Sequence, residues 1–208
     1  MTAGKFITLE GGEGAGKSTQ AKLLAEALTA EGIPTLLTRE PGGTPGAESL
    51  RALLLSGAID WSLPAETLLH FAARAEHVEK TIRPALAAGM GVVCDRFADS
   101  TMAYQGYGLC GDRAMIATLT ELIGLKPDLT IILDVPEDVG RSRVQQRGSR
   151  ADRYEQLDAA FHARVNAGFR AIAQGDPDRC VLVAAHGTPE TVHHKVKQLA
   201  QGRLFRKA

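Results

Sequence analysis

The sequence predicts an α/β protein in which a parallel sheet is flanked by helices. Short runs rich in Val, Ile and Leu alternate with helix-compatible segments, and enough sequence separates consecutive runs for a crossover helix. The expected strands are 6–9, 35–38, 91–94, 129–133 and 180–183. Right-handed crossovers place helices on both faces of such a sheet and ligands at the carboxyl ends of its strands.

Length and composition favour one domain over residues 1–208, because no proline or serine tract marks a linker. The formal net charge is zero, so nothing indicates a nucleic-acid or membrane partner, and small ligands are expected. Cys94, Cys110 and Cys180 lie far apart without CxxC spacing, which favours reduced thiols in a cytosol. No apolar run is long enough for a signal peptide or a membrane span. A cytoplasmic location is therefore expected.

The most specific pattern is a glycine-rich loop, Gly-Gly-Glu-Gly-Ala-Gly-Lys-Ser, at residues 11–18. It follows the first expected strand and precedes a helix-like stretch at 19–31. Glycines let successive backbone N–H groups point inward at a polyphosphate, and the helix turns its positive end toward the same anion. Lys17 would then reach the β and γ phosphates, and Ser18 would ligate Mg²⁺. The alternative, a flexible turn, does not explain the strand-to-helix context.

Charged clusters follow other strands and should border the same cleft. Arg39 opens the Arg-Glu-Pro-Gly-Gly segment after the second strand, Asp95 and Arg96 follow the third, and 134–137 follows the fourth. Asp95 is placed to hold a metal-bound water or Lys17; helix capping is the alternative. Arg96, together with Arg39 and Arg51, could neutralise a second phosphate opposite the first. Two facing phosphate sites are a transferase geometry.

A planar base could be read by two helical segments. Thr101 and Gln105 are four residues apart and share a face if 100–106 is helical. Arg74 lies on a long helical stretch, 66–88, with His70 and Phe71 four and three residues before it. A ring plus a donor suits a carbonyl-bearing base. The alternatives are ordinary core packing for Phe71 and a solvated position for Arg74.

Four arginines, at positions 143, 147, 150 and 153, surround a Gly-Ser break after the fourth strand. An exposed basic helix is one reading. A lid over residues 143–154 is the other, because such a segment can close over a triphosphate and offer cations to the migrating phosphoryl group.

Taken together, these features resemble the bacterial thymidylate kinase family over nearly the whole chain. The segments that carry the resemblance are 10–19, 38–44, 83–86, 95–97, 100–106, 127–129, 133–137 and 152–155. Segments 39–44 and 103–106 separate this family from adenylate and guanylate kinases. The resemblance implies the five-stranded parallel architecture of P-loop nucleoside monophosphate kinases, a homodimer, and in-line transfer of the γ-phosphoryl group from MgATP to dTMP, which gives dTDP for dTTP biosynthesis.

The resemblance also implies roles for individual residues. The expected ATP-binding residues are Gly11, Gly12, Glu13, Gly14, Ala15, Gly16, Lys17, Ser18, Thr19 and Arg143, with Ser18 and Asp95 as metal ligands. The expected dTMP-binding residues are Glu13, Arg51, His70, Phe71, Arg74, Arg96, Thr101, Tyr104 and Gln105. Glu13 would lie near the sugar 3′-hydroxyl, and Tyr104 under the deoxyribose. Lys17, Arg96, Arg147 and Arg153 are expected to be catalytic; the two lid arginines are implied because the loop lacks a basic residue at Gly14 or Ala15.

Two positions depart from the family pattern. The family usually has a phenylalanine four residues before the base-reading arginine, where this chain has His70, so His70 and Phe71 both stay candidates for stacking. Phe97 replaces the usual tyrosine after Asp95 and Arg96. Three rival functions are a P-loop switch or motor ATPase, a nucleotide-binding module without catalysis, and a kinase for another monophosphate such as dUMP or dCMP.

Overall fold

A computed structural model describes residues 4–146 and 153–205 of the chain. The strands are β1 (Phe6–Gly11), β2 (Thr35–Arg39), β3 (Gly91–Asp95), β4 (Leu129–Asp134) and β5 (Cys180–Ala184). The helices are α1 (Lys17–Ala30), α2 (Pro45–Leu55), α3 (Leu63–His77), α4 (Arg83–Ala87), α5 (Ala98–Thr101), α6 (Arg113–Ile123), α7 (Glu137–Gln146), α8 (Ala159–Gly175) and α9 (Pro189–Leu204), with π-helical turns η1 (Val78–Ile82) and η2 (Met102–Gly108).

The five predicted strands are confirmed, and they form one parallel sheet in the order β2-β3-β1-β4-β5. Each strand runs one or two residues beyond its predicted end, so that Arg39 and Asp95 are the last residues of their strands. Leu9 and Arg39 both pair with Asp95 in the register. The chain leaves β1 toward β2 on one side and later crosses to β4 on the other, and such switch points are where α/β sheets bind ligands.

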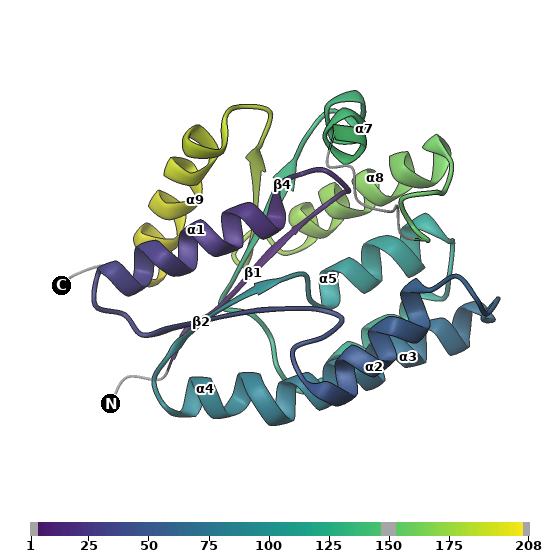
Figure 1. Ribbon diagram of the computed structural model, residues 1–208, viewed down its shortest axis with the longest axis horizontal. Helices are drawn as coiled ribbons and strands as arrows, with labels where there is room; N and C mark the ends of the chain where they lie inside the picture. Colours follow the sequence, from purple (N-terminus) through teal and green to yellow (C-terminus); the bar gives the residue numbers. More distant parts are fainter. Residues whose placement is uncertain (1–3, 147–152, 206–208) are drawn as a thin grey trace.

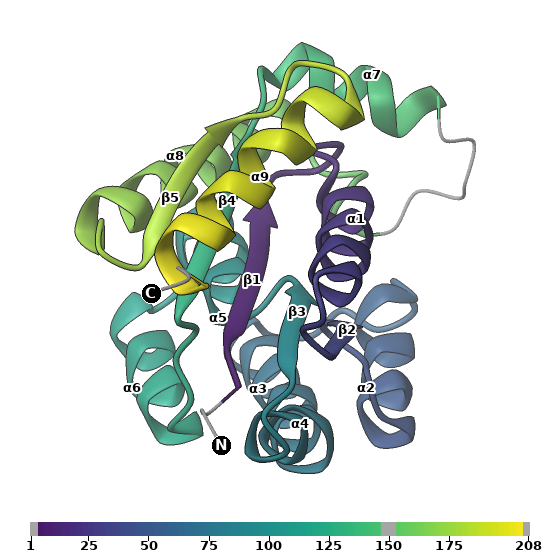
Figure 2. The same ribbon diagram turned by 90° about the vertical axis from the view of Figure 1, so that its left-hand side faces the viewer.

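Helices cover both faces of the sheet (Figures 1 and 2). Alternate residues of β1 point to opposite faces, as a strand requires. Leu9 packs with Leu24 of α1 and Val196 of α9 in one core cluster. Phe6 packs with Phe97 on the other face, where their rings meet edge to face at 5.0 Å. This two-sided core fixes the strand ends that carry the polar residues.

The long helical stretch expected at 66–88 is confirmed as α3, η1 and α4 in continuous succession. Its middle is π-helical at Val78–Ile82, which periodicity does not reveal. The expected helix at 100–106 spans the end of α5 and most of η2. Among the described residues, no helix is long and apolar enough to cross a membrane.

Candidate functional site

The glycine loop between β1 and α1 adopts a conformation that side chains oppose. Gly11, Gly14 and Gly16 have φ values of 134°, 68° and 92°, which are the left-handed backbone region where a Cβ atom is strained. Ala15 between them is buried in the core beside β1. The loop is thus anchored at Ala15 while its backbone turns around an open space at the start of α1, where helix N–H groups favour an anion.

Two cavities meet at this loop. The loop cavity, about 620 Å³, is lined by Glu13, Gly14, Gly16, Lys17, Ser18, Thr19, Arg39, Glu40, Arg51, Leu55, Asp95, Arg96, Arg143, Val144 and Glu155. The inner cavity is lined by Glu13, Glu40, Pro41, Arg51, Leu55, His70, Arg74, Arg96, Phe97, Ser100, Thr101, Tyr104, Gln105 and Tyr154. Glu13, Glu40, Arg51, Leu55 and Arg96 line both. Ligands in the two cavities would therefore meet at Glu13 and Arg96.

Lys17 and Ser18 stand on the first turn of α1 and face the loop cavity. Lys17 Nζ donates to the carbonyl of Gly12 at 2.7 Å. Burial and the neighbouring Arg96 lower the pKa of Lys17 to about 8, against the opposing pull of Glu13 and Asp95. The ammonium group therefore stays largely charged at neutral pH, and an added polyphosphate would favour its charged form further.

Ser18 Oγ donates to Asp95 Oδ2 at 2.5 Å, which joins the start of α1 to the end of β3. The other carboxylate oxygen, Asp95 Oδ1, is buried and has no hydrogen-bond partner among the described residues. A hydroxyl beside a carboxylate supplies the hard oxygen ligands that Mg²⁺ prefers, and the unpartnered oxygen fits a cation or one of its waters. The residues present thus fit the metal that the sequence predicts.

Arg96 and Glu13 form an ion pair at the junction of the cavities. Arg96 has a φ of 71°, and its Nη2 lies 2.6 Å from Glu13 Oε1, which also accepts from the Tyr104 hydroxyl at 2.6 Å. Burial alone would raise the pKa of Glu13, but Arg96, Lys17 and Tyr104 lower it to about 2. Glu13 also raises the pKa of Arg96, although burial opposes this shift. The site therefore holds a fixed cation at the junction at any physiological pH.

Hydrogen bonds to Glu10 of β1 stabilise the left-handed backbone at Arg96. Glu10 is fully buried and accepts from the amide of Phe97 at 2.7 Å and from Ser100 Oγ at 2.5 Å. Burial and the nearby Asp99 raise the pKa of Glu10. The residue directly before the glycine loop thus holds the turn that carries Arg96, a role that no local pattern indicates.

Arg74 lies deep in the inner cavity as a fixed donor. Its Nε donates to Glu40 Oε2 at 2.8 Å and its Nη2 to Thr101 Oγ1 at 3.0 Å. Its Nη1 is buried and has no partner among the described residues. A buried, unpartnered N–H in a cavity wall is costly unless a ligand satisfies it. Arg74 is therefore arranged to meet an acceptor atom, as the sequence predicts.

The structure separates the two candidates for the stacking ring. His70 lines the inner cavity, whereas Phe71 does not; Phe71 instead lies against Arg74, whose Cζ is 4.7 Å from the ring centroid. Phe71 faces away from the cavity because one step along a helix turns a side chain by about 100°. Burial and the positive charges of Arg74 and Arg96 lower the pKa of His70 to about 3, so its ring is neutral.

A polar cluster that includes Tyr154 and Gln105 lies in one wall of the inner cavity. The Tyr154 hydroxyl donates to Glu66 Oε1 at 2.8 Å and lies 3.0 Å from His70 Nε2. Gln105 Nε2 donates to Glu66 Oε1 at 2.9 Å and to the Tyr154 hydroxyl at 3.0 Å. Arg153 Nη1 pairs with Glu66 Oε2 at 2.7 Å. Gln105 lines the cavity as predicted, but its amide nitrogen is already engaged by protein groups.

Three other predicted cations, Arg39, Arg51 and Arg143, line the loop cavity. Arg51 Nη1 donates to the Pro41 carbonyl at 2.8 Å, and Arg39 pairs with Glu48 at 3.0 Å. Arg143 donates to the carbonyls of Ala185 and Gly187, which fastens α7 beside the loop. Arg153 pairs with Glu66 and does not line the loop cavity.

Arg147, like Arg150 and Asp152 of the expected lid, lies outside the described residues. Asp134, expected at the common cleft, does not line the loop cavity and pairs with Arg170 at 2.9 Å. Two buried members of the site, Glu66 and His77, were not predicted, because their hydrogen-bond partners lie 37 or more residues away in sequence and leave no local pattern.

Comparisons with known proteins show the family of the chain. A family model described as thymidylate kinase matches residues 9–196. A protein of Gluconobacter oxydans named thymidylate kinase is 58% identical, covering 97% of this chain and 96% of its own. One of Caulobacter vibrioides with the same name is 50% identical, covering 98% and 99%. The crystal structure of thymidylate kinase from Ehrlichia chaffeensis superposes with a TM-score of 0.80 at 39% identity, covering 96% of this chain and 99% of that one. The chain belongs to the thymidylate kinase family.

Proposed function

We propose that the chain phosphorylates dTMP to dTDP, with the loop cavity binding MgATP and the inner cavity binding dTMP. The observation that carries this assignment is the junction at Arg96 and Glu13, which both cavities share. A donor phosphate on one side and an acceptor phosphate on the other would meet beside a buried guanidinium. The inner cavity is called the acceptor cavity from here on.

The donor side follows from the first turn of α1. The amides of residues 11–19 and Lys17 bind the ATP phosphates, and Arg143 lies on the adenine side. Ser18 and Asp95 hold Mg²⁺, which when bound neutralises charge on the polyphosphate. Because Lys17 Nζ now donates to the Gly12 carbonyl, it needs only a small movement to donate to a phosphate oxygen instead.

On the acceptor side, Arg96 and Arg51 bind the dTMP phosphate, and Glu13 lies by the sugar hydroxyl. Tyr104 packs under the deoxyribose, where its ring leaves little room for a 2′-hydroxyl. Arg74, Thr101 and Gln105 read the thymine edge, and His70 provides the stacking ring. The acceptor phosphate has its second pKa near about 6 and is largely a dianion at neutral pH, so positioning and charge stabilisation suffice without a strong base.

The catalytic cations proposed for the migrating phosphoryl group are Lys17, Arg96 and the lid arginines Arg147 and Arg153. Arg153 pairs with Glu66 in this structure. Its catalytic role therefore requires that this ion pair opens when both nucleotides are bound.

A panel of monophosphates with MgATP, followed by ADP release, tests the function. The rate should be highest with dTMP, lower with dUMP, and much lower with dCMP and dAMP. Equal rates with dAMP and dTMP would overturn the assignment. Lys17→Met serves as the control for contaminating kinases, because it removes the donor-side cation while leaving the acceptor cavity intact.

We further propose a homodimer in the cytoplasm. Exposed leucines lie on three helices, Leu53 on α2, Leu68 on α3 and Leu122 on α6, the last 76% exposed, and α3 packs against both α2 and α6. Large apolar side chains gathered on neighbouring helices favour a covered surface. All three cysteines are free thiols, as expected in a reducing compartment. Sedimentation of Leu68→Glu tests the surface: it should be monomeric, and an unchanged dimer would exclude this face.

A further inference from the structure

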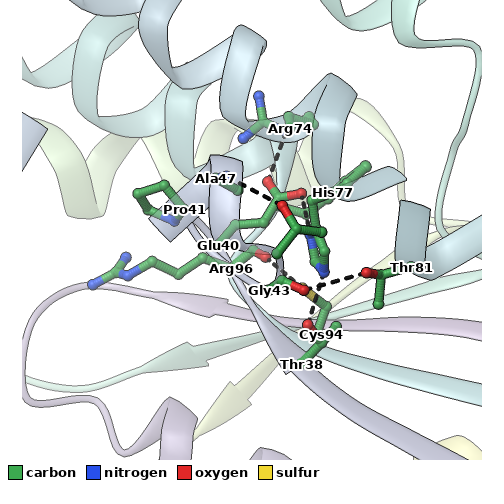
Figure 3. Close-up of polar contacts among 12 residues, drawn as sticks. Thr38, Glu40, Pro41, Gly43, Ala47, Arg74, His77, Thr81, Cys94 and Arg96 are labelled. Carbon is green, nitrogen blue, oxygen red and sulfur yellow. Dashed lines mark hydrogen bonds and ion pairs between the residues drawn. The ribbon is translucent and has the colours of Figure 1, made fainter. Parts of the chain in front are cut away.

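Arg74 belongs to a buried charged cluster whose other two members, Glu40 and His77, have no role in the function proposed above. Glu40 follows β2, and Arg74 and His77 lie three residues apart on α3; all three side chains are at most 4% exposed. Glu40 Oε2 accepts from Arg74 Nε at 2.8 Å, and Glu40 Oε1 contacts His77 Nδ1 at 3.0 Å (Figure 3). The carboxylate thus bridges two side chains on one face of the helix.

The orientation of Arg74 depends on this carboxylate. The guanidinium carbon Cζ lies over the rings of Phe71 and Phe97, 4.7 and 5.1 Å from their centroids. These contacts do not decide which N–H group faces the cavity. The bonds to Glu40 and Thr101 engage Nε and Nη2 and leave Nη1 as the donor without a partner among the described residues.

His77 in turn fixes Glu40. A carboxylate acceptor requires a proton on His77 Nδ1, and the Thr38 hydroxyl, 2.7 Å from Nε2, holds the other side of the ring. Gly43, whose φ is 87°, lies directly over the imidazole: a Cβ atom there would come within 2.4 Å of Nε2. The ring therefore has no room to shift, and Glu40 Oε1 would have no other partner among the described residues if the ring were removed.

We infer that His77 is a positioning residue for base recognition, which holds Glu40 and through it aims Arg74 Nη1 at the edge of the acceptor base. This inference rests on the proposed function, in which Arg74 reads that edge. The chemistry recognised is a carbonyl oxygen, since Nη1 can only donate. An amino group at the same place would bring two donors together.

The pair dUMP and dCMP isolates this contact. They share the phosphate and the sugar and differ only at base positions 3 and 4, where uracil presents an N–H and a carbonyl, and cytosine a bare nitrogen and an amino group. The quantity to measure is the ratio of kcat/KM for dUMP to kcat/KM for dCMP, with MgATP saturating. A purely structural role for His77 would lower both values together and leave the ratio unchanged.

Two substitutions at position 77 form a matched pair. In His77→Asn the amide nitrogen takes the place of Nδ1 and can still donate to Glu40, whereas in His77→Gln it takes the place of Nε2, on the Thr38 side. His77→Gln should lower the ratio by about tenfold, the scale of a hydrogen bond to a charged group. His77→Asn should keep the ratio within about threefold of the parent.

The outcomes separate the two proposals. A parent enzyme that does not prefer dTMP over dAMP overturns both. A parent with the expected preference, combined with a His77→Gln enzyme whose ratio stays within about twofold, overturns only the role of His77. If circular dichroism shows that His77→Gln does not fold, Glu40→Gln decides: a ratio lowered at least about fivefold supports the inference, and an unchanged ratio overturns it.

Discussion

Replacement of Arg153 by alanine should both weaken the fold and slow phosphoryl transfer, and Glu66 allows the two effects to be separated. Glu66 is completely buried, and its Oε1 accepts from Tyr154 and Gln105. Among the described residues, its Oε2 faces only Arg153, at 2.7 Å. Arg153→Ala therefore leaves one oxygen of a buried carboxylate without a partner.

The size of the stability loss follows from the burial of the pair. Breaking a fully buried ion pair costs about 3–5 kcal/mol, and because Arg153 is 24% exposed we expect about 2–3 kcal/mol here. For a domain of this size that lowers Tm by roughly 5–10 °C. Glu66→Gln keeps an acceptor for Tyr154 and Gln105 but removes the charge, so the double variant should recover most of the loss in a thermal melt followed by circular dichroism.

Catalysis should not recover in the same way. If Arg153 stabilises the migrating phosphoryl group, Arg153→Ala lowers kcat at least about 100-fold, measured by coupled ADP release, and the double variant stays equally slow. The Glu66→Gln enzyme provides the reference for any effect on the acceptor cavity. A double variant whose kcat returns to within a few-fold of this reference would refute the catalytic role and leave Arg153 as a partner of Glu66 alone.

Three further predictions concern the two cavities. Lys17→Met should lower kcat at least about 1000-fold, because no other lysine lines the loop cavity among the described residues; a loss below tenfold would contradict this. In His70→Phe, urea unfolding should show a flatter dependence of stability on pH between 6.5 and 3. The native pKa of His70, about 3, lies below the unfolded value of 6.5, so its contribution is complete above pH 6.5 and is lost as the pH falls; an unchanged slope would argue against a neutral His70. Glu13→Gln should flatten the same curve between pH 4.5 and 2, where the low pKa of Glu13 makes the parent lose stability on acidification, and a slope equal to that of the parent would exclude the ion pair with Arg96.

The strands and the glycine loop could be predicted because their signals are local. Runs of β-branched residues mark β1 to β5, and the loop at 11–18 combines turn, charge and hydroxyl within eight positions. The strand order could not be predicted, since alternating strands and helices specify a parallel sheet but not the side on which each new strand is added. Local spacing likewise predicted that Thr101 and Gln105 share a helix face, and both line the inner cavity.

Buried polar partners escaped prediction for a different reason. The contact between His70 and Tyr154 joins residues 84 positions apart, and the bond between Glu40 and His77 spans 37. A single sequence shows a carboxylate or an imidazole but not the tertiary contact that buries it. The left-handed backbone at Arg96 could not be predicted either, because it is imposed by Glu10 and the end of β3 and not by the arginine itself.

The neutral His70 also has a consequence for the selectivity of inhibitors. Where a relative carries phenylalanine at this position, that part of the cavity wall is a hydrocarbon, whereas here it is a polar imidazole whose Nε2 lies 3.0 Å from the Tyr154 hydroxyl. A thymidine analogue that carries a small hydrogen-bonding substituent toward this wall would gain a partner in this enzyme and lose solvation in such a relative. The imidazole that distinguishes this chain from the common family pattern is thus a selectivity determinant for compounds meant to inhibit one thymidylate kinase and not another.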